Sequence, residues 1–341
     1  MNHGLKSNEK EEYRSNPKTH NKYKEMMSTI PRRKHSLMGD LYHYEGFWCN
    51  SSHFEGILSA QDNFKPQPNN VILSSAPKSG TTWLKTLSFG ILTRFHFNES
   101  TNPLLTRMAH DLVPCLELEV RSNTQTLDLN VPLLATHIPY TSLPKSIINS
   151  GCKIVYICRD PKDVFVSLWH FLHKVRSKDG EISAMKELHL EDAFELFCEG
   201  VSTFGPYWDH VLGYWRASLE SLERILFLKY EDLKNDTVYW VKEIAQFMGY
   251  AFSMEEEDKG VVHKIINLCS FENLSSLDVN KSGIVQVGAN FLPLKNNAYF
   301  RKGEVGDWKN HFTPKMAMRL DQITQQKLNG SGLTLHFSSN A

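Results

Sequence analysis

The chain has 341 residues, of which 41% are hydrophobic and 11% aromatic, so it can bury a sizeable core and is not a largely disordered protein. Its 38 Lys and Arg residues balance 38 Asp and Glu residues. A net charge of zero excludes nucleic-acid binding through a global basic field but leaves room for a local basic pocket. The length suits one large α/β domain or two ordinary ones.

The N-terminal region and the cysteines indicate the compartment. Residues 1–24 are charged throughout and contain no apolar stretch of signal-peptide type, and no run of 18 apolar residues follows. The six cysteines form no Cys-x-x-Cys pair, which is typical of reduced thiols rather than of a disulfide framework or a zinc site. We therefore expect a cytoplasmic protein without membrane association.

Two regions differ in composition. Residues 1–36 are rich in Lys, Glu, Asn and Ser, and we expect them to form a mobile N-terminal tail. No repeat and no Pro/Gly/Ser-rich linker divides the remainder, so we expect residues 37–341 to form a single domain.

In chain order, short apolar runs alternate with amphipathic helices. The runs at residues 71–76, 153–159 and 225–230 predict buried strands. Helices are predicted after them by apolar spacing from Leu84 to Phe95, from Val164 to Val175, and over residues 238–248. A capping box at Ser253 and Glu256 predicts the start of a helix that carries Val262, Ile265, Ile266 and Cys269.

Strand–turn–helix units in series predict an α/β fold with a central, mainly parallel sheet flanked by helices. Ligands of such sheets bind beyond the carboxyl ends of the strands. The residues that follow each predicted strand are therefore the first candidates for a functional site.

The turn after the first strand, residues 77–83 (PKSGTTW), has the composition of an anion cradle. Gly80 allows close backbone approach, while Lys78, the nearby hydroxyls and a helix N-terminus supply donors. An ordinary strand–helix turn would need only the glycine. A nucleotide kinase is the natural rival, but a Walker A loop places its Lys after a second Gly, whereas Lys78 precedes the single Gly80.

This loop and three downstream segments resemble the cytosolic sulfotransferase family, in particular its plant branch and the flavonol sulfotransferases. The downstream segments are RDPKD with Ser167, KYEDL, and the pair CSF and RKGEVGDW, at residues 159–167, 229–233, 269–271 and 301–308. The resemblance covers residue 37 to the C-terminus. It implies a sulfotransferase fold of the P-loop-kinase-like type and transfer of a sulfuryl group from 3′-phosphoadenosine 5′-phosphosulfate (PAPS) to a hydroxyl.

The resemblance also implies which residues bind PAPS. They are Lys78, Ser79, Gly80, Thr81 and Thr82 at the 5′-phosphosulfate, Arg159 and Ser167 at the 3′-phosphate, Trp83, Tyr230 and Phe271 at the adenine, and Arg301, Lys302 and Gly303 in a C-terminal phosphate-binding segment. Physical chemistry agrees, because a ligand with phosphates at opposite ends needs two separate cationic sites. Core packing would explain Trp83 and Phe271 as readily as stacking on adenine would.

His137 follows an apolar run that predicts a further strand, and a lone histidine is usually structural. Here it matches the catalytic histidine of the family, where a neutral imidazole takes the proton of the attacking hydroxyl. Lys78 would stabilise the charge on the leaving bisphosphate. Animal relatives often carry a Lys where this chain has Ala135, so the number of positive groups on the sulfuryl is open. No metal-ligand spacing occurs, and we expect no metal.

The acceptor pocket is implied by resemblance alone and includes Phe47, Trp48, Cys115 and Phe171. Aromatic walls suit a flat phenolic acceptor. Cys115 replaces an aromatic residue of phenol-preferring animal relatives, so we expect a roomier pocket and a flavonoid acceptor, with a steroid or a hydroxyjasmonate as alternatives. Outside this class, a nucleotide kinase and a non-catalytic nucleotide-binding module remain alternatives. Residues 309–314 and Met318 depart from the dimerisation motif of animal relatives, so we expect a monomer or a weak dimer.

Overall fold

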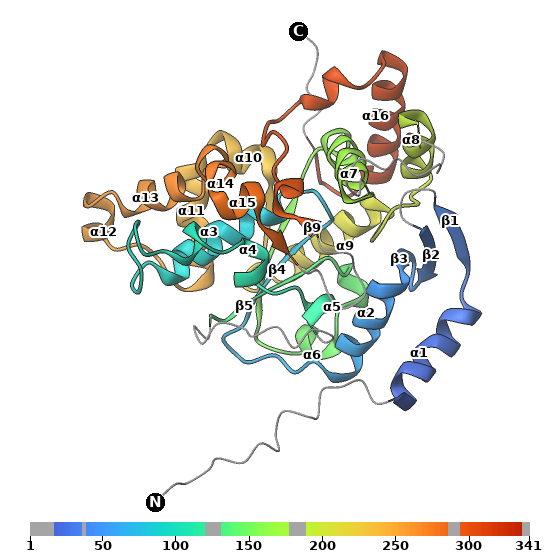
Figure 1. The fold of residues 1–341 in the computed structure, drawn as a ribbon, viewed down its shortest axis with the longest axis horizontal. Coiled ribbons are helices and arrows are strands. Elements are labelled where there is room, and N and C mark those ends of the chain that lie inside the picture. Colours follow the sequence, from blue (N-terminus) through green and yellow to red (C-terminus); the bar gives the residue numbers. More distant parts are fainter. Residues whose placement is uncertain (1–16, 36–38, 120–130, 177–188, 286–293, 336–341) are drawn as a thin grey trace, which may run out of the picture.

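Four parallel strands form the central sheet, which lies between layers of helices (Figure 1). The computed structural model describes residues 17–35, 39–119, 131–176, 189–285 and 294–335. In spatial order the strands are β5 (Leu133–Thr136), β4 (Val71–Ser75), β6 (Lys153–Cys158) and β7 (Ile225–Lys229). The three strands expected from apolar runs, and the strand expected before His137, are confirmed, as is the α/β class with a parallel sheet.

Both faces of this sheet are buried, which explains why its strands are continuous apolar runs rather than alternating patterns. Ile72 and Ile154 point into one hydrophobic core. The next residues along, Leu73 and Val155, point into a second core on the opposite face. None of these four side chains is more than 1% exposed. The sheet is therefore the middle of three layers.

Helices cover each face with their apolar sides. The face of Leu73 is covered by α3 (Thr81–Thr93), α11 (Thr237–Met248) and α13 (Val261–Leu268). The face of Ile72 is covered by α2 (Ser51–Asn63), α7 (Pro161–Arg176), α9 (Tyr207–Glu220) and α16 (Pro314–Leu328). Helices α3, α7 and α11 confirm the amphipathic runs of the sequence. However, α3 ends before Phe95, which is 66% exposed instead of buried.

Short elements connect these layers. Before β6 they are η1 (Pro103–Leu105), α4 (Ala109–Leu112), α5 (Leu116–Glu119), η2 (Tyr140–Ser142) and α6 (Lys145–Ile148). After β6 they are α8 (Leu190–Cys198), α10 (Tyr230–Asn235), α12 (Met254–Asp258), α14 (Phe271–Ser276), α15 (Asp278–Ser282), β8 (Ile284–Val285), β9 (Leu294–Lys295), η3 (Asn296–Tyr299) and η4 (Asp307–Asn310). Among the residues that the structure describes, no helix combines the length and apolarity of a membrane span.

The N-terminal segment corrects one expectation. Within the predicted mobile tail, residues 17–35 form α1 (Pro17–Thr29) and β1 (Arg32–His35), whereas residues 1–16 lie outside the described part of the chain. Tyr23 of α1 is buried, and its hydroxyl donates to the carboxylate of Asp62 at 3.1 Å. Strand β1 pairs with β2 (Gly39–Tyr44), which pairs with β3 (Phe47–Asn50). The polar composition of this segment did not indicate that it packs on the domain, because the packing of α1 depends on one buried aromatic residue, Tyr23.

A second correction concerns the helix expected after Ser253. The capping box with Glu256 is confirmed and opens α12, but this helix ends at Asp258. Gly260 then adopts φ +68°, a left-handed conformation that interrupts the helix, and α13 starts afresh at Val261. The predicted single helix is therefore two.

Packing between α2 and α5 leaves no room at Gly56, because an added Cβ would overlap the backbone carbonyl oxygen of Glu117. We predict that Gly56→Ala lowers the free energy of unfolding, measured in urea, by about 1–3 kcal/mol, the usual cost of overpacking. Gly151→Ala is the matched control, since a Cβ there has no neighbour within 4 Å. Its effect should stay within about 0.5 kcal/mol. Equal losses in both variants would contradict the packing argument.

Candidate active site

The candidate site lies where the four parallel strands end. The loop of residues 77–83 follows β4, His137 follows β5, Arg159 follows β6, and Tyr230 follows β7. Because parallel strands present their carboxyl ends at the same edge, four segments far apart in sequence meet there. The edge predicted from sequence is therefore the one at which the expected residues gather.

The loop between β4 and α3 has the backbone of a close-approach turn. Lys78 and Gly80 have φ values of +69° and +113°. A Cβ at Gly80 would come within 2.8 Å of the Tyr230 ring, so a glycine is needed here. Ser79 is buried, and the Thr81 hydroxyl shares a hydrogen bond of 2.7 Å with that of Ser75. The first turn of α3 is thereby tied to the end of β4.

Lys78 carries the positive charge of this loop in an unusual environment. Its Nζ lies 4.0 Å from the centre of the Phe171 ring and 5.6 Å from that of Tyr299. Burial, together with the nearby charges of Arg159 and Arg301, lowers the pKa of Lys78 to about 7. An anion bound in this loop would favour the protonated amine.

Tyr230 joins the segments expected to bind the nucleotide. Its hydroxyl donates to the Gly303 carbonyl oxygen at 3.1 Å, and the guanidinium of Arg159 lies 4.5 Å from its ring centre. The Trp83 ring lies 5.5 Å away. Gly303 in turn packs on Phe271, because an added Cβ there would come within 2.6 Å of that ring. The structure therefore brings together the aromatic residues that the sequence analysis placed around adenine.

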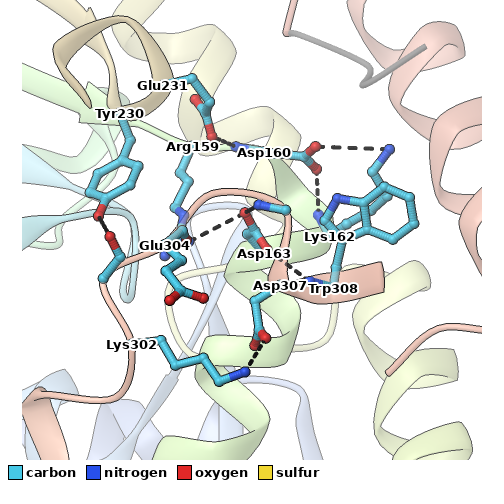
Figure 2. A network of polar contacts seen from close by, with 12 residues as sticks. Arg159, Asp160, Lys162, Asp163, Tyr230, Glu231, Lys302, Glu304, Asp307 and Trp308 are labelled. Carbon is cyan, nitrogen blue, oxygen red and sulfur yellow. Dashed lines mark hydrogen bonds and ion pairs between the residues drawn. The ribbon is translucent and has the colours of Figure 1, made fainter. Parts of the chain in front are cut away.

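Two buried carboxylates organise the cationic part of the site (Figure 2). Asp163 accepts hydrogen bonds from the backbone N–H groups of Gly306 and Trp308, at 2.7 and 3.0 Å, and lies 3.3 Å from the Arg159 guanidinium. Helix α7 is thus clipped to the C-terminal segment. Asp163 thus contacts both the guanidinium at the end of β6 and two backbone N–H groups of the C-terminal segment.

Asp307 plays the same part for the other cations. It accepts hydrogen bonds from Arg301 and from Lys302, the latter at 2.5 Å. Burial acts to raise its pKa, but the hydrogen bonds from Lys302, Arg301 and Asn310 outweigh burial and hold that pKa well below its usual range. Asp307 therefore stays ionised and keeps both cations at the site.

The arginines retain donors for a ligand. The Nε atoms of Arg159 and Arg301 are buried and have no hydrogen-bond partner within the described part of the protein. Buried polar groups are normally paired, so these two atoms fit a site that takes an anion. Ser167 is buried on α7 one turn after Asp163, the carboxylate next to Arg159. These residues fit the 3′-phosphate position that the resemblance implies.

His137 is held by its ring. Its Nδ1 lies 2.7 Å from the carbonyl oxygen of Ser75. A carbonyl oxygen can only accept, so Nδ1 carries the proton and the lone pair of Nε2 is left as an acceptor. Burial lowers the pKa of His137 to about 4, against an upward influence of Glu117. The imidazole is therefore neutral at pH 7, as a proton acceptor must be.

Glu117 is a site residue that the sequence analysis missed. It is fully buried, and its carboxylate accepts the backbone N–H of His137 at 2.8 Å and the Thr136 hydroxyl at 2.9 Å. The available signal was a charged residue inside the apolar stretch 112–118, which could not identify its partner. Glu117 positions the turn on which the histidine sits.

The structure separates the two acceptor residues of β3. Phe47 is 2% exposed and stacks on Phe204 at 6.1 Å between ring centres, and the Phe204 ring lies 5.6 Å from that of His137. Side chains alternate along a strand, so Trp48 points to the opposite face, where it lies 4.7 Å from His43. The Phe47 side chain is thus connected to His137 through Phe204, whereas Trp48 contacts Phe204 only through its backbone carbonyl oxygen, which accepts the Phe204 N–H at 2.6 Å in the described structure.

The other two expected acceptor residues come from different segments, Cys115 from just before α5 and Phe171 from α7. Cys115 forms an isolated β-bridge with Ala135, two residues before His137. Phe171 lies under the Lys78 amine. Within the described residues, no three His, Cys, Asp or Glu side chains are grouped as metal ligands would be.

Residues 68–332 match the family model of the sulfotransferase domain. A flavonol sulfotransferase-like protein of Flaveria bidentis is 48% identical over 319 residues, which cover 91% of this chain and 99% of the relative. Cytosolic sulfotransferase 16 of Arabidopsis thaliana is 45% identical over 324 residues, 94% of each chain. The crystal structure of a mouse sulfotransferase complexed with PAP is 26% identical with a TM-score of 0.61, and covers 86% of this chain and 95% of that one.

The pKa of His137 can be tested without any substrate. Because burial lowers it to about 4, we predict that its ring resonances do not titrate between about pH 5.5 and pH 8 in NMR spectra. A histidine-containing peptide in the same buffer, titrating near pH 6.5, is the control. Removing the negative charge with Glu117→Gln should leave His137 neutral over this range, since Glu117 acts to raise its pKa. A midpoint near 6.5 for His137 would contradict the burial argument.

Proposed function

The chain belongs to the sulfotransferase family, in its plant branch, and from this we propose that it transfers a sulfuryl group from PAPS to a hydroxyl of a flat plant phenolic, first of all a flavonoid. The observation that carries the proposal is that the loop of residues 77–83 and His137 follow the adjacent, paired strands β4 and β5. An anion cradle and a neutral proton acceptor then face one site.

The geometry supports a direct displacement. The acceptor oxygen attacks the sulfur while the Nε2 lone pair of His137 takes its proton, and the bond from sulfur to the bridging phosphate oxygen breaks. Lys78 stabilises the charge that develops on the leaving 3′,5′-bisphosphate. Its lowered pKa suits this role, because the approach of negative charge favours the protonated amine. Positioning and electrostatics supply the catalysis, as in phosphoryl transfer.

Cofactor binding is assigned to the clusters around Tyr230, Asp163 and Asp307. The unpaired Nε atoms of Arg159 and Arg301 support a 3′-phosphate there, since they offer buried donors to an anion. Trp83 lies against the Tyr230 ring and Phe271 against Gly303, and we assign both rings to the adenine. The PAP complex of the mouse neighbour supports the same ligand class.

A flavonoid acceptor is supported by the aromatic approach to His137 and by the Flaveria relative named for flavonols. The Phe204 ring lies next to the imidazole, and Phe47 stacks on Phe204. Cys115 is a small side chain beside β5. A polycyclic ring system fits such walls better than a single phenol does. A steroid or a hydroxyjasmonate is the second candidate, since both are larger than a phenol.

Three further properties complete the proposal. The enzyme needs no metal, because Lys and Arg side chains supply the positive charge. It acts in the cytosol, as the name of its Arabidopsis relative suggests. It is a monomer or a weak dimer, since Pro314 lacks a backbone donor at the start of α16 and Met318, exposed on that helix, carries no charge.

We predict that His137→Ala lowers kcat by about 100-fold or more, because a general base contributes about 10²–10⁴ to the rate. Affinity for PAP, measured by calorimetry, should stay near the wild-type value, since His137 does not belong to the nucleotide clusters. His263→Ala, on the exposed side of α13, is the control and should change neither quantity. A His137→Ala enzyme that keeps a tenth of the wild-type kcat would refute the assignment.

Acceptor choice is tested by comparing kcat/KM for a flavonol, a brassinosteroid-like sterol, a hydroxyjasmonate and a simple phenol. We predict the highest value for the flavonol. Cys115→Phe should reduce kcat/KM for the flavonol more than for the simple phenol, because it narrows the wall beside β5. A simple phenol that is better by about tenfold or more in the wild type would contradict the roomy pocket, because a single apolar contact is worth about 10-fold or more in kcat/KM.

A further inference from the structure

Lys85 is a buried lysine that belongs neither to the hydrophobic cores nor to the proposed chemistry. It lies on α3, three residues after Thr82, and its side chain is only 1% exposed. A buried ammonium is costly unless hydrogen bonds compensate it. The Lys85 amine donates to the Val113 carbonyl oxygen at 2.8 Å and lies 3.1 Å from Nδ1 of His110. Residues 110–113 therefore hold this charge beside the first turn of α3.

The contact with Lys85 determines the tautomer of His110. An ammonium group has three donors and no acceptor, so Nδ1 of His110 must accept. The ring proton is then on Nε2. Burial, followed by the charge of Lys85, lowers the pKa of His110 well below its usual value, which keeps the ring neutral. His110 is consequently an Nε2–H donor.

That donor points at the anion cradle. Nε2 of His110 lies 3.2 Å from the hydroxyl oxygen of Thr82. Because Nε2 carries the ring proton, it donates to this oxygen, and the Thr82 hydroxyl accepts. The hydroxyl has a single proton, and this proton is directed away from the imidazole. Thr82 belongs to the loop of residues 77–83, so its proton is left to donate within that loop. Lys85, His110 and Thr82 form a one-way chain of hydrogen bonds.

The same cation acts on the rest of the site. Lys85 lowers the pKa of His137, so its charge reaches the proton acceptor from the side of α3. The Ala135 N–H donates to the carbonyl of Pro114 at 2.7 Å, which places the residues that hold Lys85 alongside β5. Strand β5 has no cationic side chain of its own, and helix α3 brings one to it.

We propose that Lys85 is a positioning residue that acts through His110 to orient the Thr82 hydroxyl as a hydrogen-bond donor toward the phosphosulfate group of bound PAPS. This inference rests on the proposed function, because PAPS is the anion assigned to the loop. It adds two residues, Lys85 and His110, that touch neither the co-substrate nor the acceptor but determine which way a loop hydroxyl points.

The wild-type protein provides the first test. A long-range ¹⁵N–¹H correlation spectrum distinguishes the two neutral tautomers of histidine, and we expect His110 as the Nε2–H form. In Lys85→Met, which removes the donor at similar volume, this tautomer should lose its preference. A wild-type His110 protonated on Nδ1 would overturn the proposal whether or not any variant folds.

The second test is a double-mutant cycle on kcat/KM for PAPS. Thr82→Val should lower it by about 10-fold, the usual effect of losing one hydrogen bond to a charged group. Lys85→Met should lower it by a similar factor, and the double variant should lose no more than Thr82→Val alone, because both changes remove the same interaction. Losses that multiply in the double variant would show that Lys85 acts by another route and would overturn the proposal.

Conservative variants separate positioning from folding. Thr82→Ser keeps the hydroxyl and should retain activity near wild type. His110→Gln keeps a side-chain N–H for Thr82 and should retain more activity than the matched His110→Leu. Equal losses of activity in His110→Gln and His110→Leu, with both variants folded by circular dichroism, would contradict the proposed chain of hydrogen bonds from Lys85 to Thr82. A wild type without PAPS turnover would overturn the proposed function itself, whereas an active wild type with multiplying losses overturns only this inference.

Discussion

The concentration of buried positive charge at one edge of the sheet is the constraint on which the rest of the structure depends. Arg159 and Arg301 are brought there from the end of β6 and from the C-terminal segment, and Lys78 from the loop after β4. Isolated buried charges are expensive, so each must be paired or give up its proton. Asp163 and Asp307 pair the arginines, while Lys78 rests on aromatic rings with its pKa lowered to about 7. An anionic ligand would therefore favour the protonated form of Lys78.

The carboxylates also determine how distant segments are assembled. Asp163 on α7 binds two backbone N–H groups of the C-terminal segment, and the Tyr230 hydroxyl binds the carbonyl of Gly303 in the same segment (Figure 2). Polar contacts thus fix the positions of the candidate binding residues on α7, at Tyr230 and in the C-terminal segment relative to one another. Such buried polar networks favour a single arrangement. The segment that supplies Arg301 and Lys302 is held in place by the residues with which it acts.

His137 illustrates how the same edge produces a proton acceptor beside a cationic loop. The carbonyl of Ser75 takes the Nδ1 proton, Glu117 holds the backbone, and burial keeps the ring neutral. The cation of Lys85 acts in the same direction as burial, since it lowers the pKa of the imidazole. The neutral base and the positive charge are therefore compatible, because the charge of Lys85 lowers the pKa of the imidazole and so helps to keep it unprotonated.

The sequence by itself determined the features that depend on neighbours along the chain. Apolar runs such as residues 71–76 specified strands, the capping box at Ser253 specified a helix start, and the order of Lys78 and Gly80 separated this loop from a Walker A loop. Tertiary structure decided whatever depends on partners far apart in sequence. It anchored α1 through Tyr23, paired Glu117 with His137, and joined Lys85 on α3 to His110. It also placed Phe47 and Trp48 on opposite faces of β3, because the direction of a side chain is known only once the strand is paired and packed.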